Sequence, residues 1–332
     1  MLSVLLLAVI SLPGEEAPPR FDPPPRLAIS AEELAVRRAS PGFPEQRAKS
    51  VQAAEALVEN PPELPDGPGS WIFYYANPEN GNRLVPISPT EHQDPATGKV
   101  FADERTRAAY RTVLHGRAEA AALTLAWAYA DSGDERYAAG VRRILGKLAE
   151  DYPGYPNRHD RWGLRGWFAP LGGRRYVQSL DEAHEIIKLA KAYDLTRTAS
   201  VYSDEDRTKI EKDLFRATAD TLLWFNQGIN NHQTWYNAGL MAIASVLGDA
   251  ELARKVVTMC GGFRDQLARS VGEDGLWYEG AGLSQLCPAG PDRNCRCRTA
   301  HGVAAGRGGE ISAHVHGPPS GDVSQWGFSG HQ

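Results

Sequence analysis

The stretch ERTRAAYRTVLHGRAEAAALTLAWAYADSGDERYAAGVRRILGKLAEDY, residues 104–152, decides the fold class of this chain. Apolar residues recur at helical spacing over Glu104–Asp131 and again over Glu135–Tyr152, which is the pattern of helices that bury one face. Gly133 and Asp134 separate the two runs, and such a pair suits the end of one helix and the start of the next. The stretch therefore predicts an antiparallel helical hairpin.

The same pattern recurs along the rest of the chain. Ser30-Ala-Glu-Glu33 resembles a capping box that opens a helix to about residue 39. Further helices are predicted near residues 45–59, 180–199, 203–225, 233–247 and 250–271, and a short strand at 71–75. Repeated hairpins without clear strands predict an all-α array. Such pairs stack into solenoids or closed α/α toroids, and the pattern alone leaves both open.

Composition narrows the function classes. The chain has 332 residues, a net charge of −5 and a mean hydropathy of −0.41. These values exclude a multispanning membrane protein and argue against a general nucleic-acid binder, which would be basic. Three of the four cysteines follow residue 286, so the helical part is not expected to rely on disulfides. We expect no cofactor.

The two ends differ from the body. Residues 1–12 form an apolar run of signal-peptide length, too short to span a bilayer, and 13–26 are a proline-rich linker. We therefore expect export to the periplasm or the exterior and no stable membrane insertion. Residues 27–286 are expected to form one helical domain.

The last segment, 287–332, contains no Leu, Lys, Met or Tyr. A shifted reading frame over 286–302 restores a Leu/Ala-rich helical pattern, so we expect a disordered, frameshifted tail. Cys295, Cys297 and the nearby histidines lack the usual zinc spacing, and no metal site is predicted.

Asn230, Asn231 and His232 lie between two predicted helices. Amides and an imidazole at a helix N-terminus suit an anion, because the free N–H groups and the helix dipole favour negative charge. The alternative is that the asparagines cap the helix and the imidazole is a satisfied polar group.

Other candidate residues lie elsewhere. Trp277 and Tyr278 offer flat faces for sugar rings, and Glu279 is a possible acid or base; an ordinary aromatic-anchored loop is the alternative. Tyr110 and Arg117 share a helix face, where Arg117 could meet a substrate carboxylate; a solvated helix face is the alternative. Two basic-aromatic segments are groove candidates: the loop containing Trp162 and Arg165, and 174–176. Structural roles are the alternative for both.

Taken together, several stretches resemble the heparinase II/III-like and alginate lyase superfamily of polysaccharide lyases. The likeness covers roughly residues 70–285, and it is carried by Asn231–Tyr236, Asp274–Gly280, Gly133–Tyr137 and Gln178–Glu182. The resemblance implies an (α/α) toroid with a substrate groove, followed in the family by a β-sandwich domain that we expect to be absent here.

By the same resemblance, the substrate is an acidic polysaccharide such as alginate or a glycosaminoglycan, cleaved by β-elimination. Asn231 and His232 would neutralise the uronate carboxylate, and a tyrosine would move the C5 proton. The substrate-binding residues would be Tyr110, Arg117, Trp162, Arg165, Gln178, Trp235, Tyr236, Trp277, Tyr278 and Glu279.

The family's catalytic tyrosine would fall near Ser284–Leu286, where this chain has none. We therefore expect impaired activity. Two other readings stay open: a toroidal glycoside hydrolase that uses Asp274 and Glu279, and a non-catalytic carbohydrate-binding remnant.

Overall fold

Helix α3 (Glu104–Ser132) is the longest element of the computed structural model, which describes residues 19–159, 164–165 and 172–272. The Asp103 carboxylate caps its start, accepting from the Thr106 N–H at 3.0 Å. Gly133 ends it with φ of 75°, a left-handed conformation that glycine adopts without a Cβ clash. Helix α4 (Glu135–Asp151) follows at once, which confirms the predicted hairpin.

The other elements follow in chain order. The remaining helices are α1 (Ala31–Ala39), α2 (Phe43–Glu59), α5 (Ser179–Thr196), α6 (Asp204–Lys209), α7 (Ala217–Trp224), α8 (Asn231–Leu247), α9 (Ala250–Thr258) and α10 (Phe263–Ser270), with a π-helical turn, η5 (Ile210–Arg216), between α6 and α7. Short 3₁₀ turns occur at η1 (Ile72–Tyr74) and η2 (Tyr152–Gly154). The strands are two residues each: β1 (Val85–Pro86), β2 (His92–Gln93), β3 (Val100–Phe101), β4 (Arg158–His159) and β5 (Leu164–Arg165).

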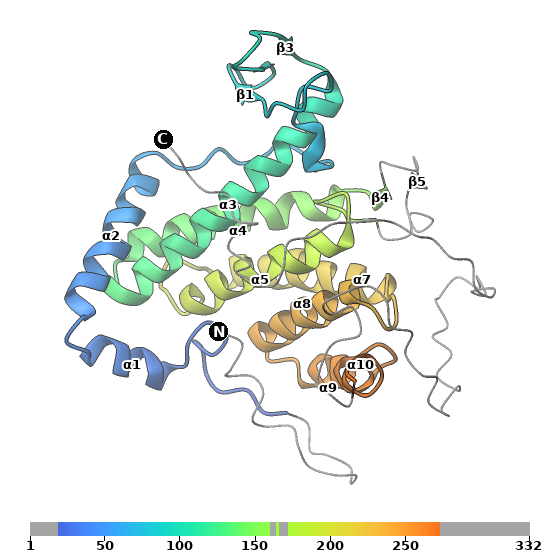
Figure 1. Ribbon diagram of the computed structural model, residues 1–332. Helices are drawn as coiled ribbons and strands as arrows, with labels where there is room; N and C mark the ends of the chain where they lie inside the picture. Colours follow the sequence, from blue (N-terminus) through green and yellow to red (C-terminus); the bar gives the residue numbers. More distant parts are fainter. Residues whose placement is uncertain (1–18, 160–163, 166–171, 273–332) are drawn as a thin grey trace.

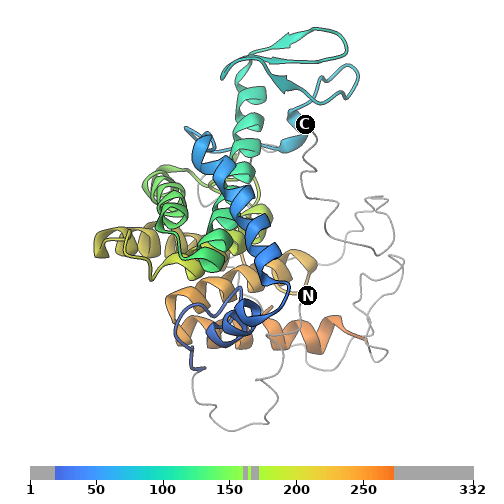
Figure 2. The ribbon, with the colours of Figure 1, turned by 90° about the vertical axis from the view of Figure 1, so that its left-hand side faces the viewer.

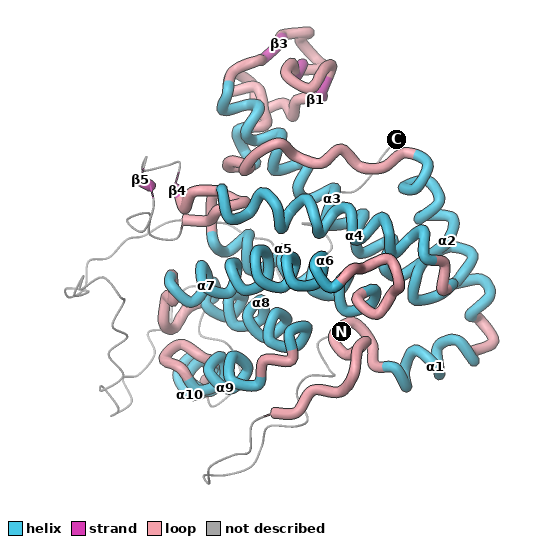
Figure 3. Tube along the Cα trace, turned by 180° about the vertical axis from the view of Figure 1, so that it is seen from behind, coloured by secondary structure: helices cyan, strands magenta, loops and turns pink. Residues whose placement is uncertain are grey.

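The helices stack as antiparallel hairpins. Helices α3, α5 and α8 run side by side in one direction, with α5 in contact with both α3 and α8, and α4, the α6–α7 segment and α9 run back alongside them (Figure 1). The antiparallel sheet β1-β2-β3 forms a small lobe at the N-terminal end of α3, which stands clear of the stack in a view turned by 90° (Figure 2) and from behind (Figure 3). The predicted all-α fold class with antiparallel hairpins is confirmed.

The centre of the stack is the contact between α5 and α8. The two helices contribute the buried side chains Ile186, Leu189, Tyr193, Leu240 and Ile243 to the main hydrophobic core. At Gly239 the two backbones approach so closely that a Cβ would lie 2.8 Å from the Ala183 carbonyl oxygen. The N-terminal ends of α5 and α8 therefore lie next to each other.

One short element differs from the sequence prediction. Residues 71–75 were expected to form a strand, but they form the 3₁₀ turn η1, in which the Tyr74 and Tyr75 N–H groups donate to the carbonyls of Trp71 and Ile72. The turn buries Tyr75 against Tyr110, with the ring centroids 5.3 Å apart. The aromatic run is thus a packing cluster under the lobe.

The sequence predicted one helix over 250–271, but the structure has two separate helices there, α9 and α10. Between them Gly261 has φ of 72° and packs on Gly228, where a Cβ would come within 2.6 Å of the carbonyl oxygen. Cys260 also lies in this turn. The other three cysteines lie outside the described residues.

Within the described ranges, no helix combines the length and apolarity that a membrane crossing requires.

We predict that Gly239→Ala destabilises the protein by about 1–3 kcal/mol, because the added methyl group pushes α5 and α8 apart. Gly146→Ala in α4 is the matched control. A Cβ there meets no atom within 4 Å, so this substitution should stabilise by about 0.5–1 kcal/mol through helix propensity alone. Urea unfolding measures both, and equal effects would contradict the close α5–α8 contact.

Candidate functional site

The site begins at the N-terminus of α8. Asn230 caps the helix, since its Oδ1 accepts from the Gln233 N–H at 2.8 Å. Asn231 is the first helical residue and is exposed, and His232 follows it half-buried. The two predicted catalytic residues therefore lie in the first turn, where the positive end of the helix dipole favours an anion.

Buried side-chain amides hold the loop before α8 in place. The Gln233 side chain is fully buried; its Oε1 accepts from the Gln227 N–H at 2.8 Å, and its Nε2 donates to Asn237 Oδ1 at 2.9 Å. Gln266 of α10 donates to the Gly228 carbonyl at 2.9 Å. Because buried amides are bonded to fixed backbone groups, the loop presents Asn231 and His232 in one geometry.

The start of α5 lies against this loop through a buried tyrosine. The Tyr236 hydroxyl is hydrogen-bonded to Ser179 of α5 and accepts from Gln227 Nε2. Tyr236 has no exposed surface, and burial raises its pKa to about 12. Gln178, the N-cap residue of α5, is half-buried beside Ser179. Tyr236 therefore joins the two helix ends.

Segment 172–178 leads into α5 and is fixed by buried charges that sequence reasoning missed. Glu182 accepts from the N–H groups of Arg174, Arg175 and Tyr176, at 2.8 Å and 3.0 Å for the first and last. Arg175 pairs with Glu119 of α3 at 3.1 Å, and the Tyr176 hydroxyl donates to Glu119 at 2.8 Å.

The interpretation of 174–176 as groove-lining is wrong for two of these residues. Arg175 and Tyr176 are 1% and 4% exposed, because they partner the buried Glu119. Burial raises the pKa of Glu119 well above its usual value, and Arg175 opposes that rise. The only sequence signal for this burial was Glu119, an acidic residue on the apolar face of α3. Helical periodicity alone does not predict the partner of such a residue.

Tyr110 and Arg117 lie on one face of α3, as their spacing predicts. Tyr110 is buried against the rings of Tyr75 and His92, whereas Arg117 is exposed. Burial raises the pKa of Tyr110. Arg117 is two residues from the buried Glu119, so the two side chains leave α3 on different faces, and that of Arg117 is exposed.

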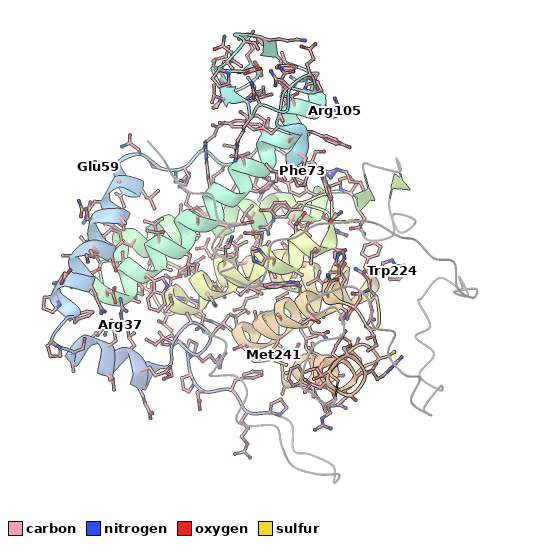
Figure 4. The ribbon with its side chains drawn as sticks, viewed as in Figure 1. Arg37, Glu59, Phe73, Arg105, Trp224 and Met241 are labelled. Carbon is pink, nitrogen blue, oxygen red and sulfur yellow. The ribbon has the colours of Figure 1, made fainter. Side chains whose placement is uncertain are left out.

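Two aromatic side chains, those of Trp235 and Phe73, are exposed to solvent. Trp235 is 38% exposed and meets His184 of α5 edge-on, with ring centroids 4.8 Å apart. Phe73, 66% exposed and 5.7 Å from the Trp71 ring, was not singled out from the sequence. Figure 4 shows Phe73 at the base of the lobe and Trp224 at the end of α7, just before the loop that leads to α8.

Several predicted residues have no described side chain. Arg165 is in β5, where its backbone pairs with Arg158 of β4. Trp162, Trp277, Tyr278 and Glu279 lie outside the described residues, as does the 287–332 tail. Within the described ranges, no group of three or more His, Cys, Asp or Glu side chains could hold a metal ion.

The fold and site define an all-α protein of stacked hairpins with an amide–imidazole pair at a helix N-terminus. The alginate lyase family model matches residues 74–281, and the chain belongs to this family. No curated protein matches the chain.

Solved structures are similar to parts of the chain. An alginate lyase from Bacteroides ovatus is 18% identical, with 76% of this chain and 69% of that one covered and a TM-score of 0.49. Alginate lyase A1-III from Sphingomonas species A1 is 18% identical, with 68% of this chain and 60% of that one covered and a TM-score of 0.40. A variant of that enzyme, complexed with a tetrasaccharide, is 19% identical, with the same coverage and a TM-score of 0.37.

We predict that Asn230→Ala lowers the free energy of unfolding by about 1 kcal/mol, because the Gln233 N–H loses its cap acceptor. Asn230→Asp keeps that acceptor and should retain most of the stability. Thermal or urea unfolding separates the two. If Asn230→Ala proved as stable as wild type, Asn230 would not hold the start of α8.

Proposed function

We propose that this protein is a polysaccharide lyase whose Asn231–His232 site binds the carboxylate of a uronic acid unit in an acidic polysaccharide of the alginate type. The observation that carries the proposal is the position of both side chains in the capped first turn of α8, above a braced loop. Membership in the alginate lyase family supports it.

The chemistry of β-elimination explains why these residue types suit the site. The C5 proton of a uronate is adjacent to a carboxylate, whose negative charge opposes formation of the carbanion. Donors that neutralise the carboxylate stabilise the enolate-like transition state, as an oxyanion hole does. The Asn231 amide and the His232 imidazole N–H would be those donors, and the positive end of α8 adds to them.

Proton transfer needs a further group. A tyrosine acts as a base at neutral pH only where nearby positive charge lowers its pKa. Burial instead raises the pKa of Tyr75, Tyr110 and Tyr236. None of these three phenols suits the role, and the family's tyrosine position falls at Ser284–Leu286. We therefore propose that the chain binds polyuronate but turns it over weakly.

The remaining predicted residues would hold the polymer. Arg117 is exposed and cationic, and Trp235 exposes part of its ring, so they suit a carboxylate and a sugar face respectively. We keep Gln178 as a proposed contact because it begins α5 beside Ser179. We also propose that the apolar run at residues 1–12 directs export of the chain.

We predict that His232→Ala and Asn231→Ala each weaken binding of an oligouronate about 10- to 100-fold, since each removes a hydrogen bond to a charged group. Isothermal titration calorimetry measures the affinity. Thr234→Ala, at an exposed position on the same helix, is the matched control and should bind as wild type does. Unchanged affinity in both site variants would point to generic carbohydrate binding instead.

We also predict that incubation with alginate gives only slow formation of the unsaturated product, followed by its ultraviolet absorbance. Robust formation would contradict the proposed impairment while supporting the lyase chemistry. New reducing ends without absorbance would instead indicate a hydrolase, for which Asp274 and Glu279 are the candidate pair.

A further inference from the structure

His232 touches a side chain that neither the resemblance nor the family assignment singles out. Gln227, in the loop before α8, places its Nε2 3.5 Å from His232 Nδ1. The same Nε2 donates to the buried Tyr236 hydroxyl. Gln227 thus lies between the candidate catalytic imidazole and the tyrosine that joins α5 to α8.

The orientation of the Gln227 amide can be assigned from the Gln233 backbone N–H, which can only donate a hydrogen bond. The Gln233 N–H donates to Asn230 Oδ1 at 2.8 Å, so the Asn230 side chain turns its Nδ2 the other way. That Nδ2 donates to Gln227 Oε1 at 3.2 Å. Gln227 Oε1 is therefore directed at Asn230, and its Nε2 is directed at Tyr236 and His232.

An amide Nε2 has two N–H donors and no acceptor. The ring nitrogen facing it must carry a lone pair, which leaves the proton of a neutral imidazole on the other nitrogen. We propose that Gln227 is a positioning residue that holds His232 in the neutral Nε2–H tautomer, and thereby makes it a hydrogen-bond donor to the uronate carboxylate. The role of His232 as a donor to the uronate carboxylate rests on the proposed function. The assignment of the tautomer does not.

The tautomer has a chemical consequence at the site. With Nδ1 directed at Gln227 and Nε2 protonated, neutral His232 has no lone pair left with which to take the C5 proton. It acts as a donor to the carboxylate, and proton transfer has to come from another group. This assignment agrees with a mechanism in which imidazole and phenol have separate roles.

The direct test is a long-range ¹H–¹⁵N correlation spectrum of the histidine side chains in the wild-type protein without ligand, at neutral pH. His232→Gln identifies the His232 signals by their loss. We expect a protonated Nε2 and an unprotonated Nδ1. A protonated Nδ1 with an unprotonated Nε2 would overturn the proposal, whether or not the chain binds polysaccharide.

Two substitutions at Gln227 test its role. Gln227→Glu offers an acceptor to Nδ1, so the proton should move to Nδ1 and oligouronate affinity should fall at least ~10-fold, in line with the loss of a hydrogen bond to a charged group. Gln227→Met removes the donor at similar size, and both tautomers should then appear. Gln52→Glu, at an exposed position on α2, adds the same charge elsewhere and should change neither property.

These outcomes separate the two proposals. An Nε2–H tautomer that shifts in Gln227→Glu, in a chain that does not bind polyuronate, would support the role of Gln227 and contradict the proposed function. A spectrum that is the same in wild type, Gln227→Glu and Gln227→Met would overturn the role of Gln227. If Gln227→Glu fails to fold, the wild-type spectrum and Gln227→Met still decide.

Discussion

The contact between the backbones of α5 and α8 at Gly239 is the constraint on which the site depends. It sets side by side two helices that begin at the same end of the stack, so the positive ends of their dipoles lie at that end. Ser179 at the start of α5 is hydrogen-bonded to Tyr236 of α8, and no side chain separates the two helices at Gly239. A larger residue at 239 would move the two helix ends relative to each other.

Polar side chains inside the helix stack fix the loops at that end. Gln233 and Gln266 bind backbone groups of the loop before α8, and Glu182 binds three N–H groups of the segment before α5. The buried pair of Arg175 and Glu119 ties that segment to α3. Burying charge is costly unless it is paired, so we interpret these groups as serving loop geometry more than overall stability.

Sequence periodicity predicted α3, α4, α5 and α8 because apolar residues at helical spacing are a local signal of a buried face. It failed at residues 71–75 because an aromatic run looks like a strand, whereas the stacking of Tyr75 on Tyr110 favours a tight turn. It failed at Gly261 because that break is set by a contact with Gly228, far away in the sequence. Such long-range contacts leave no periodic trace in a single sequence.

In the candidate site, too, local sequence patterns were recognised and long-range contacts were missed. Asn230 to His232 were recognised because cap residues before an apolar run are a local pattern, and the family likeness added the role of the pair. Gln227 and Glu182 were missed because their importance lies in which backbone and ring atoms they meet after folding. Tyr176 and Arg175 were misjudged because a basic-aromatic segment reads as exposed, and only the position of Glu119 shows why it is buried.

The most direct measurement is a crystal structure of the chain bound to a short oligouronate. We expect one uronate carboxylate within hydrogen-bond distance of the Asn231 side-chain amide and His232 Nε2, at the N-terminus of α8. An oligosaccharide bound in full occupancy elsewhere, with Asn231 and His232 making no contact to it, would contradict the proposed site.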